Sequence, residues 1–316
     1  MPQMRILVTG GAGFIGVNIC KIFLKRGHTV VAIDNLITSD GSNLNTLKHF
    51  PRFTFMKADI TKPFPKTVRA PRFRFHEIYH LACPTGVDNL LRLGEEMLRT
   101  CAIGTRNVLE FARTHRSNVL FASSSEIYGD PQVTPQTEEY TGNVNPIGVR
   151  STYEEGKRFA ESLVSLYVRK YELDCRIVRI FNTYGPGMSD TDSRVIPRFL
   201  HQAQTGEPLT VHGKGTQKRT FCYVDDLVRG LLIVMKRGKP GEVYNLGSLE
   251  QITIRQLARV IRVITKSPSP IIFTDRPEHD HGHRMPSLGK VKKIGWYPTV
   301  SLRKGIALTL RKYTPE

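Results

Sequence analysis

Short runs of β-branched and other apolar residues alternate with amphipathic segments through the first half of the chain. The runs predict strands, and the spacing of apolar residues between them predicts helices. The expected strands are Arg5–Thr9, Thr29–Ile33, Phe53–Lys57, Glu77–Leu81, Val119–Ala122 and Asp174–Arg179. The expected helices are Ile15–Arg26, Leu90–Thr114 and Thr152–Tyr171. Strand–helix alternation with apolar strands indicates an α/β fold built on a doubly wound parallel sheet.

The pattern changes after about residue 182, where turns such as Gly185–Gly187 interrupt shorter elements. Residues 221–237 and 253–265 have helical periodicity, whereas residues 266–286 are rich in Pro, His and Asp and predict a loop. We therefore expect residues 1–181 to form a Rossmann-type domain that binds a dinucleotide. Residues 182–316 are expected to form a smaller substrate-binding lobe that is interleaved with it.

Composition narrows the class of protein. The chain has 316 residues, of which 40% are hydrophobic and 23% charged, as in ordinary globular proteins. Its apolar runs are far shorter than the ~20 residues that cross a bilayer, and the N-terminus lacks a signal-peptide pattern. The five cysteines are scattered and odd in number, which argues against a disulfide framework and a zinc site. We expect a soluble cytoplasmic protein without a metal site.

The net charge is unusual. The chain carries 46 Lys and Arg against 28 Asp and Glu, a formal charge of +18, and about half of the excess lies in residues 255–316. Such a balance favours anionic partners, either nucleic acid or small phosphorylated or carboxylated molecules. The alternative is a solvated basic surface without a specific role.

A glycine motif points to a dinucleotide. Gly10, Gly13 and Gly16 follow the first strand directly and open the first helix. Glycine lets the backbone turn tightly and approach a pyrophosphate at a helix N-terminus. Asp34 ends the next strand, where a carboxylate can hold a ribose diol, which favours NAD over NADP. Asp59 follows the third strand and is a candidate for contact with the adenine.

A second motif carries acid–base chemistry. Tyr153 and Lys157 are four residues apart on an expected helix and therefore share one face. A nearby ammonium lowers the pKa of a phenol and makes it a usable base near neutral pH. The polar run Ser123–Glu126 ends a preceding strand, and together with the glycine motif it favours a functional interpretation of the Tyr153–Lys157 pair.

With these motifs the sequence resembles the extended short-chain dehydrogenase/reductases of the NAD-dependent nucleotide-sugar epimerase/dehydratase group, over nearly its whole length. The matching segments are Val8–Gly16, Asp34-Asn35, His80–Ala82, Ser125–Gly129, Tyr153 with Lys157, Tyr184–Pro186, Gly206–Thr210, Arg219–Phe221 and Tyr223–Asp226. Within that group, Gly142–Gly148, Ser125–Pro131 and His283–Ser287 are similar to UDP-glucuronate decarboxylases.

The resemblance implies NAD as cofactor and assigns residues to roles. The implied catalytic residues are Tyr153, Lys157, Ser124, Ser125, Glu126 and Arg284. The implied cofactor contacts are Gly10, Gly13, Phe14, Ile15, Gly16, Asp34, Asn35, Asp59, Ile60, Leu81, Ala82, Tyr153 and Lys157. The implied substrate contacts are Pro84, Glu126, Asn182, Arg194, Val195, Arg219, Tyr223, Arg276 and Arg284. It also implies a homodimer formed through the helices near residues 90–114 and 152–171.

The activity implied by the resemblance is decarboxylation of UDP-glucuronate to UDP-xylose through a 4-keto sugar. One alternative is 4-epimerisation of UDP-glucuronate, which shares the steps up to the 4-keto sugar. A 4,6-dehydratase is disfavoured because Ser125 stands where that branch usually has Asp. A catalytically silent scaffold that binds NAD or nucleic acid is a further alternative. The sequence departs from the family at Cys101, where Asn is frequent, at Gly187, where Arg is usual, and in Thr85–Asp88.

Overall fold

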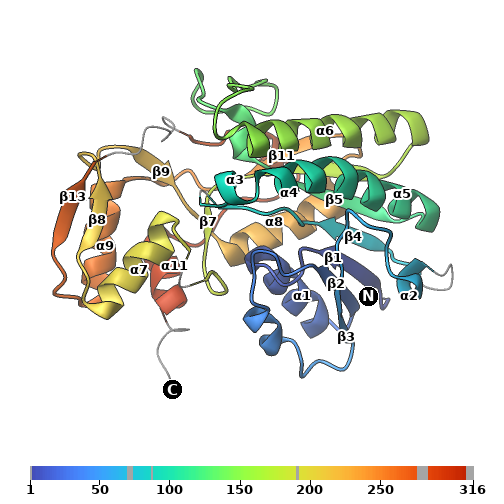
Figure 1. The fold of residues 1–316 in the computed structure, drawn as a ribbon, viewed down its shortest axis with the longest axis horizontal. Helices are drawn as coiled ribbons and strands as arrows, with labels where there is room; N and C mark the ends of the chain where they lie inside the picture. The colour runs from blue at the N-terminus through green and yellow to red at the C-terminus, as the bar shows by residue number, and fades with distance from the viewer. Residues whose placement is uncertain (1, 70–73, 87, 190–191, 276–283, 311–316) are drawn as a thin grey trace.

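A seven-stranded parallel sheet forms the centre of the molecule (Figure 1). The structure, a computed structural model, describes residues 2–69, 74–86, 88–189, 192–275 and 284–310. The strand order is β11-β6-β5-β4-β1-β2-β3. The strands are β1 Arg5–Thr9, β2 Thr29–Asp34, β3 Phe53–Lys57, β4 Glu77–His80, β5 Asn118–Ser124, β6 Cys175–Ile180 and β11 Val243–Leu246. The predicted doubly wound sheet is confirmed, and the inner strands are apolar because helices cover both faces.

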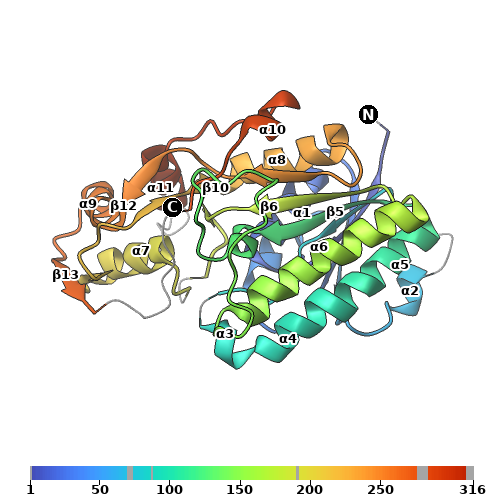
Figure 2. The same cartoon turned by 90° about the horizontal axis from the view of Figure 1, so that it is seen from above.

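Helices lie on both faces of this sheet (Figure 2). On one face, α1 Phe14–Lys25 packs against α8 Val224–Arg237. On the other face, α5 Thr105–His115 packs beside α6 Ser151–Tyr171. Short elements join the main ones: the 3-10 turns Ser42–Thr46 and Ser125–Tyr128, and helix α2 Lys66–Arg69.

The helix expected over Leu90–Thr114 is divided. It consists of α3 Asn89–Arg92, α4 Gly94–Arg99, a π-helical turn at Thr100–Gly104, and α5. Apolar spacing predicts one continuous helix because the π-helical turn covers only Thr100–Gly104 and helical segments continue on both sides of it. The turn ends where Gly104 lies against Ile60, and a Cβ at Gly104 would come within 2.8 Å of that side chain.

The C-terminal part contains its own small elements. They are β7 Thr183–Tyr184, α7 Val195–Thr205, β8 Leu209–His212, β9 Lys218–Thr220, β10 Cys222–Tyr223, β12 Gln251–Thr253, α9 Ile254–Thr265, β13 Ile271–Thr274, α10 Gly289–Lys293 and α11 Leu302–Leu310. Two expectations were wrong here. The helix expected from residue 221 begins only at Val224, because Cys222–Tyr223 form β10, which pairs with β7. The expected loop after residue 266 contains β13, which pairs with β8.

The two halves of the chain share the larger buried apolar cluster, whereas the buried residues of a second cluster all come from the first half. Strand β11 comes from beyond residue 182 and is the edge strand of the central sheet, and helix α8, also from this part, packs against that sheet. Trp296 is fully buried under α8, and its indole Nε1 donates a 2.9 Å hydrogen bond to the Asp226 carbonyl. These contacts join the predicted lobe to the sheet, while a domain boundary at residue 182 stays a prediction.

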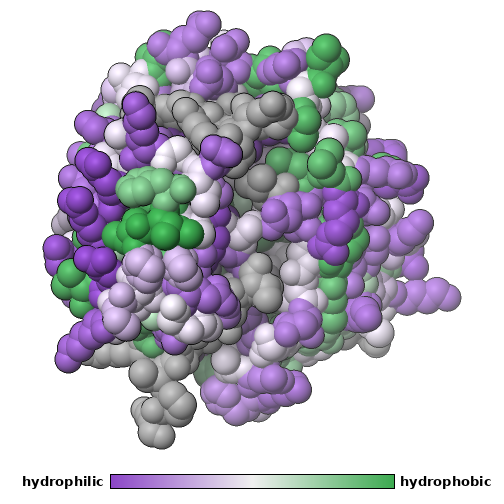
Figure 3. Space-filling model, turned by 60° about the vertical axis from the view of Figure 1, so that its left-hand side comes forward, coloured by the Kyte–Doolittle hydropathy of each residue, from purple (hydrophilic) through white to green (hydrophobic). Residues whose placement is uncertain are grey.

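Hydrophilic residues predominate on the face shown in Figure 3, and apolar residues form separate patches among them. The basic residues Arg255, Arg259, Arg262 and Lys266 are exposed on and beside α9, whose apolar residues pack into the core. Within the described residues, no helix is long and apolar enough to cross a membrane.

Candidate active site

A cavity of about 1160 Å³ opens where the strands of the central sheet end. Its walls come from the segments that follow β1, β2, β3, β4 and β5, together with α6. Ligands of open α/β sheets bind at this carboxyl edge of the strands. The cavity is therefore the place to test the predicted site residues.

The structure brings most of the predicted residues into this one cavity. Every residue expected to contact the cofactor lines it: Gly10, Gly13, Phe14, Ile15, Gly16, Asp34, Asn35, Asp59, Ile60, Leu81, Ala82, Tyr153 and Lys157. Six further predicted residues line it as well: Pro84, Ser124, Ser125, Glu126, Asn182 and Arg194. The roles of these residues stay predictions. The tertiary structure brings them together in one cavity from segments that lie far apart in the sequence.

Four predicted residues do not line the cavity: Val195, Arg219, Tyr223 and Arg284. Tyr223 is 4% exposed and packs edge-on against Tyr184. Arg219 lies on β9, where its guanidinium contacts the Lys218 carbonyl. Arg276 lies outside the described residues.

The glycine turn is shaped for close approach by a dinucleotide. Gly10 has φ +72°, and its amide donates a 2.8 Å hydrogen bond to the Ile33 carbonyl. Gly13 and the first residues of α1 line the cavity, so the positive end of this helix faces it. No acidic residue in the first turn offsets that positive end. Asp34 accepts hydrogen bonds from the amides of Ala12 and Leu36. Burial raises the pKa of Asp34, and these amides oppose the shift.

Gly16 cannot accept a side chain without a change in the turn. A Cβ there would collide with the Gly10 carbonyl oxygen and lie 2.8 Å from the Gly11 Cα, and neither backbone atom can move freely. We expect Gly16→Ala to lower the free energy of unfolding by ~1–3 kcal/mol and to weaken NAD binding. Denaturant unfolding and calorimetry measure the two effects. Gly289→Ala is the control, because its Cβ would meet nothing closer than 3.9 Å. Unchanged stability in Gly16→Ala would contradict the prediction.

Tyr153, Lys157 and Ser124 meet at the inner end of the cavity. The Lys157 ammonium is buried, donates a 2.8 Å hydrogen bond to the Ala122 carbonyl and lies 5.9 Å from the centre of the Tyr153 ring. Burial raises the pKa of Tyr153 to about 12, while the Lys157 charge and a hydrogen bond with Ser124 lower it. The expected net lowering of the Tyr153 pKa is thus not observed, because desolvation of the phenolate outweighs the charge of Lys157.

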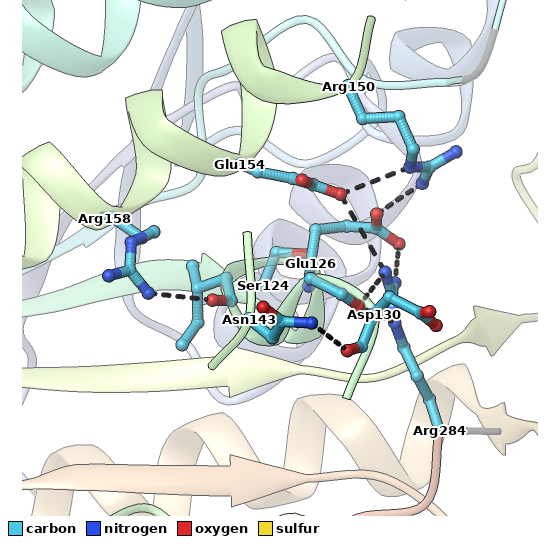
Figure 4. Close-up of polar contacts among 10 residues, drawn as sticks. Ser124, Glu126, Asp130, Asn143, Arg150, Glu154, Arg158 and Arg284 are labelled. Atoms are coloured by element: carbon cyan, nitrogen blue, oxygen red, sulfur yellow. Dashed lines mark hydrogen bonds and ion pairs between the residues drawn. The ribbon is translucent and has the colours of Figure 1, made fainter. Parts of the chain in front are cut away.

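A buried cluster of ion pairs forms the neighbouring wall (Figure 4). The Glu126 carboxylate pairs with the guanidinium groups of both Arg150 and Arg284. Arg150 also lies 3.3 Å from the carboxylate of Glu154, and Arg284 donates a 2.9 Å hydrogen bond to the Gly129 carbonyl. Burial alone would raise the pKa of Glu126, but the two arginines outweigh it and hold that pKa well below its usual range. Glu126 is therefore ionised at neutral pH.

Sequence reasoning missed Arg150 and Glu154. Arg150 lines the cavity and occupies the N-cap position of α6. Arg284 does not line the cavity, but it pairs with Glu126, which does. The sequence did contain a signal for this pair. Arg150 and Glu154 flank Tyr153 and are four residues apart, a spacing at which oppositely charged side chains on a helix pair readily.

Sequence reasoning also missed a pair of thiols. The Cys83 and Cys101 sulfurs lie 3.6 Å apart, although the residues are widely separated in the sequence. Cys83 lines the cavity, and Cys101 packs against Gly156, the neighbour of Lys157. All five cysteines are free in the structure. Among the described residues, no group of three or more potential ligands could hold a metal ion.

His80 lies buried beneath the site at the end of β4. Its ring nitrogens lie 2.8 Å from the Thr9 hydroxyl and 3.1 Å from the Thr105 hydroxyl. Burial, followed by the charge of Lys157, lowers the pKa of His80 from 6.5 to about 3. Between pH 6.5 and about pH 3, His80 binds a proton in the unfolded chain but not in the folded one. The free energy of unfolding therefore decreases as the pH falls through this range.

We therefore expect the free energy of unfolding to fall between pH 6.5 and pH 3. The contribution of His80 approaches ~1.4 kcal/mol per pH unit. Denaturant unfolding across this range should give a shallower slope for His80→Gln than for the wild type. His201→Gln, at an exposed position on α7, is the control. Equal slopes for His80→Gln and the wild type would refute the assignment.

Known proteins share both the sequence and the fold. The model of the NAD dependent epimerase/dehydratase family matches residues 6–247. UDP-glucuronic acid decarboxylase 6 of Arabidopsis thaliana is 43% identical over 308 residues, covering 97% of this chain and 88% of the relative. UDP-glucuronic acid decarboxylase 1 of Xenopus tropicalis is 40% identical over 315 residues, covering 99% and 73%.

Among solved structures, UDP-glucuronic acid 4-epimerase from Bacillus cereus, in complex with UDP-glucuronic acid and NAD, superposes with a TM-score of 0.87. It is 27% identical, and the match covers 98% of each chain. The family match spans more than half of the chain and includes the glycine turn and the Tyr153–Lys157 helix. This chain belongs to the NAD-dependent epimerase/dehydratase family.

Proposed function

We propose that this protein is an NAD-dependent UDP-glucuronate decarboxylase that forms UDP-xylose. The observation that carries the proposal is the ionised Glu126 held between Arg150 and Arg284 beside the Tyr153–Lys157 pair. The named decarboxylases among its relatives, at 40–43% identity, support the same reaction. NAD fits the cavity because the Gly10–Gly16 turn leaves room where a Cβ would collide with backbone.

The first step oxidises C4 of the sugar. Bound NAD⁺ would supply the hydride acceptor and return the hydride at the end, so it is not consumed. Tyr153 takes the O4 proton as its phenolate, the form that the Lys157 charge and the hydrogen bond with Ser124 favour against the burial that raises its pKa. Lys157 is held in place by the Ala122 carbonyl.

The second step uses the ketone. The C5 carboxylate of the 4-keto sugar is β to the new carbonyl, so C6 leaves as CO₂ and the electrons of the breaking C5–C6 bond flow into that carbonyl as an enolate. The enolate then takes a proton at C5, which restores the C4 ketone for the final reduction. The hydroxyls of Tyr153 and Ser124 stabilise the developing charge at O4. Of the two arginines that pair with Glu126, Arg150 lines the cavity and would meet an entering carboxylate, while Arg284 positions Glu126. The low pKa of Glu126 supports a role in orienting the sugar rather than in donating a proton.

The second candidate function is 4-epimerisation of UDP-glucuronate. It is favoured by the likeness to the Bacillus cereus 4-epimerase, which was solved with UDP-glucuronic acid and NAD. Decarboxylation requires the C5–C6 bond to stand perpendicular to the carbonyl plane, whereas epimerisation requires the ring to rotate with the carboxylate held in that plane. The two reactions therefore differ in how the Glu126 cluster holds the carboxylate.

Proton NMR of the purified protein with UDP-glucuronate, with and without added NAD⁺, tests the proposal. Formation of a UDP-pentose together with CO₂ supports the decarboxylase. A UDP-hexuronate with inverted C4 supports the epimerase. If neither product forms, the substrate assignment is wrong and other nucleotide sugars are tested.

The alternative from a different class of protein is a catalytically silent scaffold that binds NAD or nucleic acid. The presence of Tyr153, Lys157 and Glu126 in one cavity argues for an enzyme. The exposed basic residues of α9 are those of an amphipathic surface helix. We expect any binding to generic DNA or RNA to disappear at physiological salt, as a non-specific charge effect does. A gel-shift titration with increasing salt measures it, and specific binding that survives salt would contradict this assignment.

We also propose a homodimer and a cytoplasmic location. Helices α4 and α6 pack side by side, and together with the π-helical turn after α4 they expose the apolar side chains Leu98, Ile103, Phe159 and Leu166. A second copy of this face would bury them in a four-helix bundle. Light scattering after gel filtration should give a dimer for the wild type and a monomer for Phe159→Asp. Val263→Asp, at an exposed position on α9, is the control and should stay a dimer.

The cytoplasmic location is supported by the free thiols, which suit a reducing compartment.

A further inference from the structure

We propose that Cys83 and Cys101 form a redox-active thiol pair, which a hydroperoxide closes to a disulfide and thereby inhibits the enzyme. The inference goes beyond the proposed reaction, which does not use either thiol. It depends on the placement of the two sulfurs, on access through the cavity, and on their contacts with the catalytic helix.

The first argument is the distance between the sulfurs. Cys83 lies in the segment after β4, and Cys101 lies in the π-helical turn between α4 and α5. Their sulfurs are 3.6 Å apart, and a disulfide requires ~2.05 Å, so closure needs a relative movement of ~1.5 Å. The other thiols differ: the Cys175 and Cys222 sulfurs contact backbone carbonyls within their own strands.

The second argument is access and reactivity. Cys83 lines the cavity and is half-buried, so a small oxidant entering the cavity reaches it, whereas Cys101 is 2% exposed behind it. The hydrogen bond between the two sulfurs lowers the pKa of Cys101 to about 7. Burial opposes this shift, and the charge of Lys157 adds to it. The same hydrogen bond raises the pKa of Cys83, so the pair holds one thiolate and one shared proton near neutral pH. Transfer of that proton from Cys83 to Cys101 places the thiolate, the form that reacts with peroxides, on the sulfur that lines the cavity.

The third argument is the connection to the reacting groups. Cys101 packs against Gly156, where a Cβ would come within 3.3 Å of the sulfur, and Gly156 precedes Lys157 on α6. Cys83 begins the cavity wall that continues through Pro84, Thr85 and Gly86. A shift of ~1 Å in catalytic geometry can cost ~100-fold in rate. Closure therefore disturbs both the wall that faces the sugar and the helix that carries Tyr153 and Lys157.

The chemistry balances with a hydroperoxide as the oxidant. One thiolate attacks the peroxide oxygen, the O–O bond breaks, and the cysteine becomes a sulfenic acid while the peroxide is reduced to water or an alcohol. The second thiol then attacks the sulfenic sulfur, the S–O bond breaks and water leaves. In sum, the two thiols lose two electrons and two protons, and a dithiol reductant reverses the step.

The experiment treats the purified protein with hydrogen peroxide, blocks the remaining thiols by alkylation, and maps the peptides by mass spectrometry. We expect a Cys83–Cys101 linked peptide and two fewer titratable thiols. Activity should fall at least ~10-fold and recover with dithiothreitol. Each variant is compared with its own untreated activity. Cys83→Ser and Cys101→Ser should lose the reversible inhibition, whereas Cys222→Ala, distant from the pair, should keep it.

Three results would overturn the proposal. They are an unchanged thiol count after peroxide treatment, oxidation of Cys83 to a sulfinic acid without a linked peptide, and a linked peptide with unchanged activity. The linked peptide is detected in the wild-type protein whatever its substrate, and whether or not a variant folds. A failure of the thiols to pair can therefore be told apart from an error in the proposed decarboxylase activity.

Discussion

Tyr153→Phe is expected to lower the rate of UDP-pentose formation by ~10²–10⁴-fold, the range for loss of a general acid–base group. Phenylalanine keeps the buried ring but removes the hydroxyl that takes the O4 proton and that hydrogen-bonds with Ser124. Without this base, C4 is not oxidised, so neither CO₂ nor NADH should accumulate. Proton NMR progress curves and NADH absorbance measure both.

The control for this variant lies on the same helix. Tyr171→Phe removes a hydroxyl at the C-terminal end of α6, where the side chain is exposed, and should leave the rate unchanged. Thermal unfolding of both variants shows whether the fold is kept. A Tyr153→Phe enzyme that retains more than a tenth of the wild-type rate would rule out Tyr153 as the base.

Glu126→Gln should separate the two halves of the reaction. The substitution keeps the shape of the side chain but removes the charge that pairs with Arg150 and Arg284. We expect CO₂ release to fall by ~100-fold or more, while the Tyr153-dependent oxidation continues and NADH accumulates. Because two buried arginines then lose their counter-charge, the free energy of unfolding should fall by up to ~3–5 kcal/mol.

Glu155→Gln is the matched control, since it removes the same charge from a more exposed pair with Arg158 on α6. It should alter neither CO₂ release nor stability by a measurable amount, as surface pairs contribute ~0–1 kcal/mol. Isotope-labelled CO₂ release and stopped-flow NADH absorbance give the two rates. If Glu126→Gln lowers both rates equally, Glu126 serves the oxidation or the fold and has no separate role in decarboxylation. If its product becomes the C4 epimer, Glu126 determines the outcome for the carboxylate.

Local patterns explain why much of the fold was predictable. The glycine turn, the strand before it and the helix after it lie within Arg5–Lys25, so adjacent residues determine their structure. Tyr153 and Lys157 share a helix, and four-residue spacing is sufficient to bring them to one face. The local errors have identifiable causes. The π-helical turn is a single short segment inside a helical stretch, and β10 and β13 exist because of partners far away in the chain.

The sequence by itself thus determined the class of the sheet, the dinucleotide turn and the Tyr153–Lys157 helix, because each depends on short-range periodicity and spacing. Only the tertiary structure decided which charges and sulfurs meet. Glu126 contacts Arg284 from the far end of the chain, and Cys83 meets Cys101 across two different elements. The net pKa of Tyr153 was also decided there, because burial depends on the whole fold and here exceeds the effect of the neighbouring Lys157.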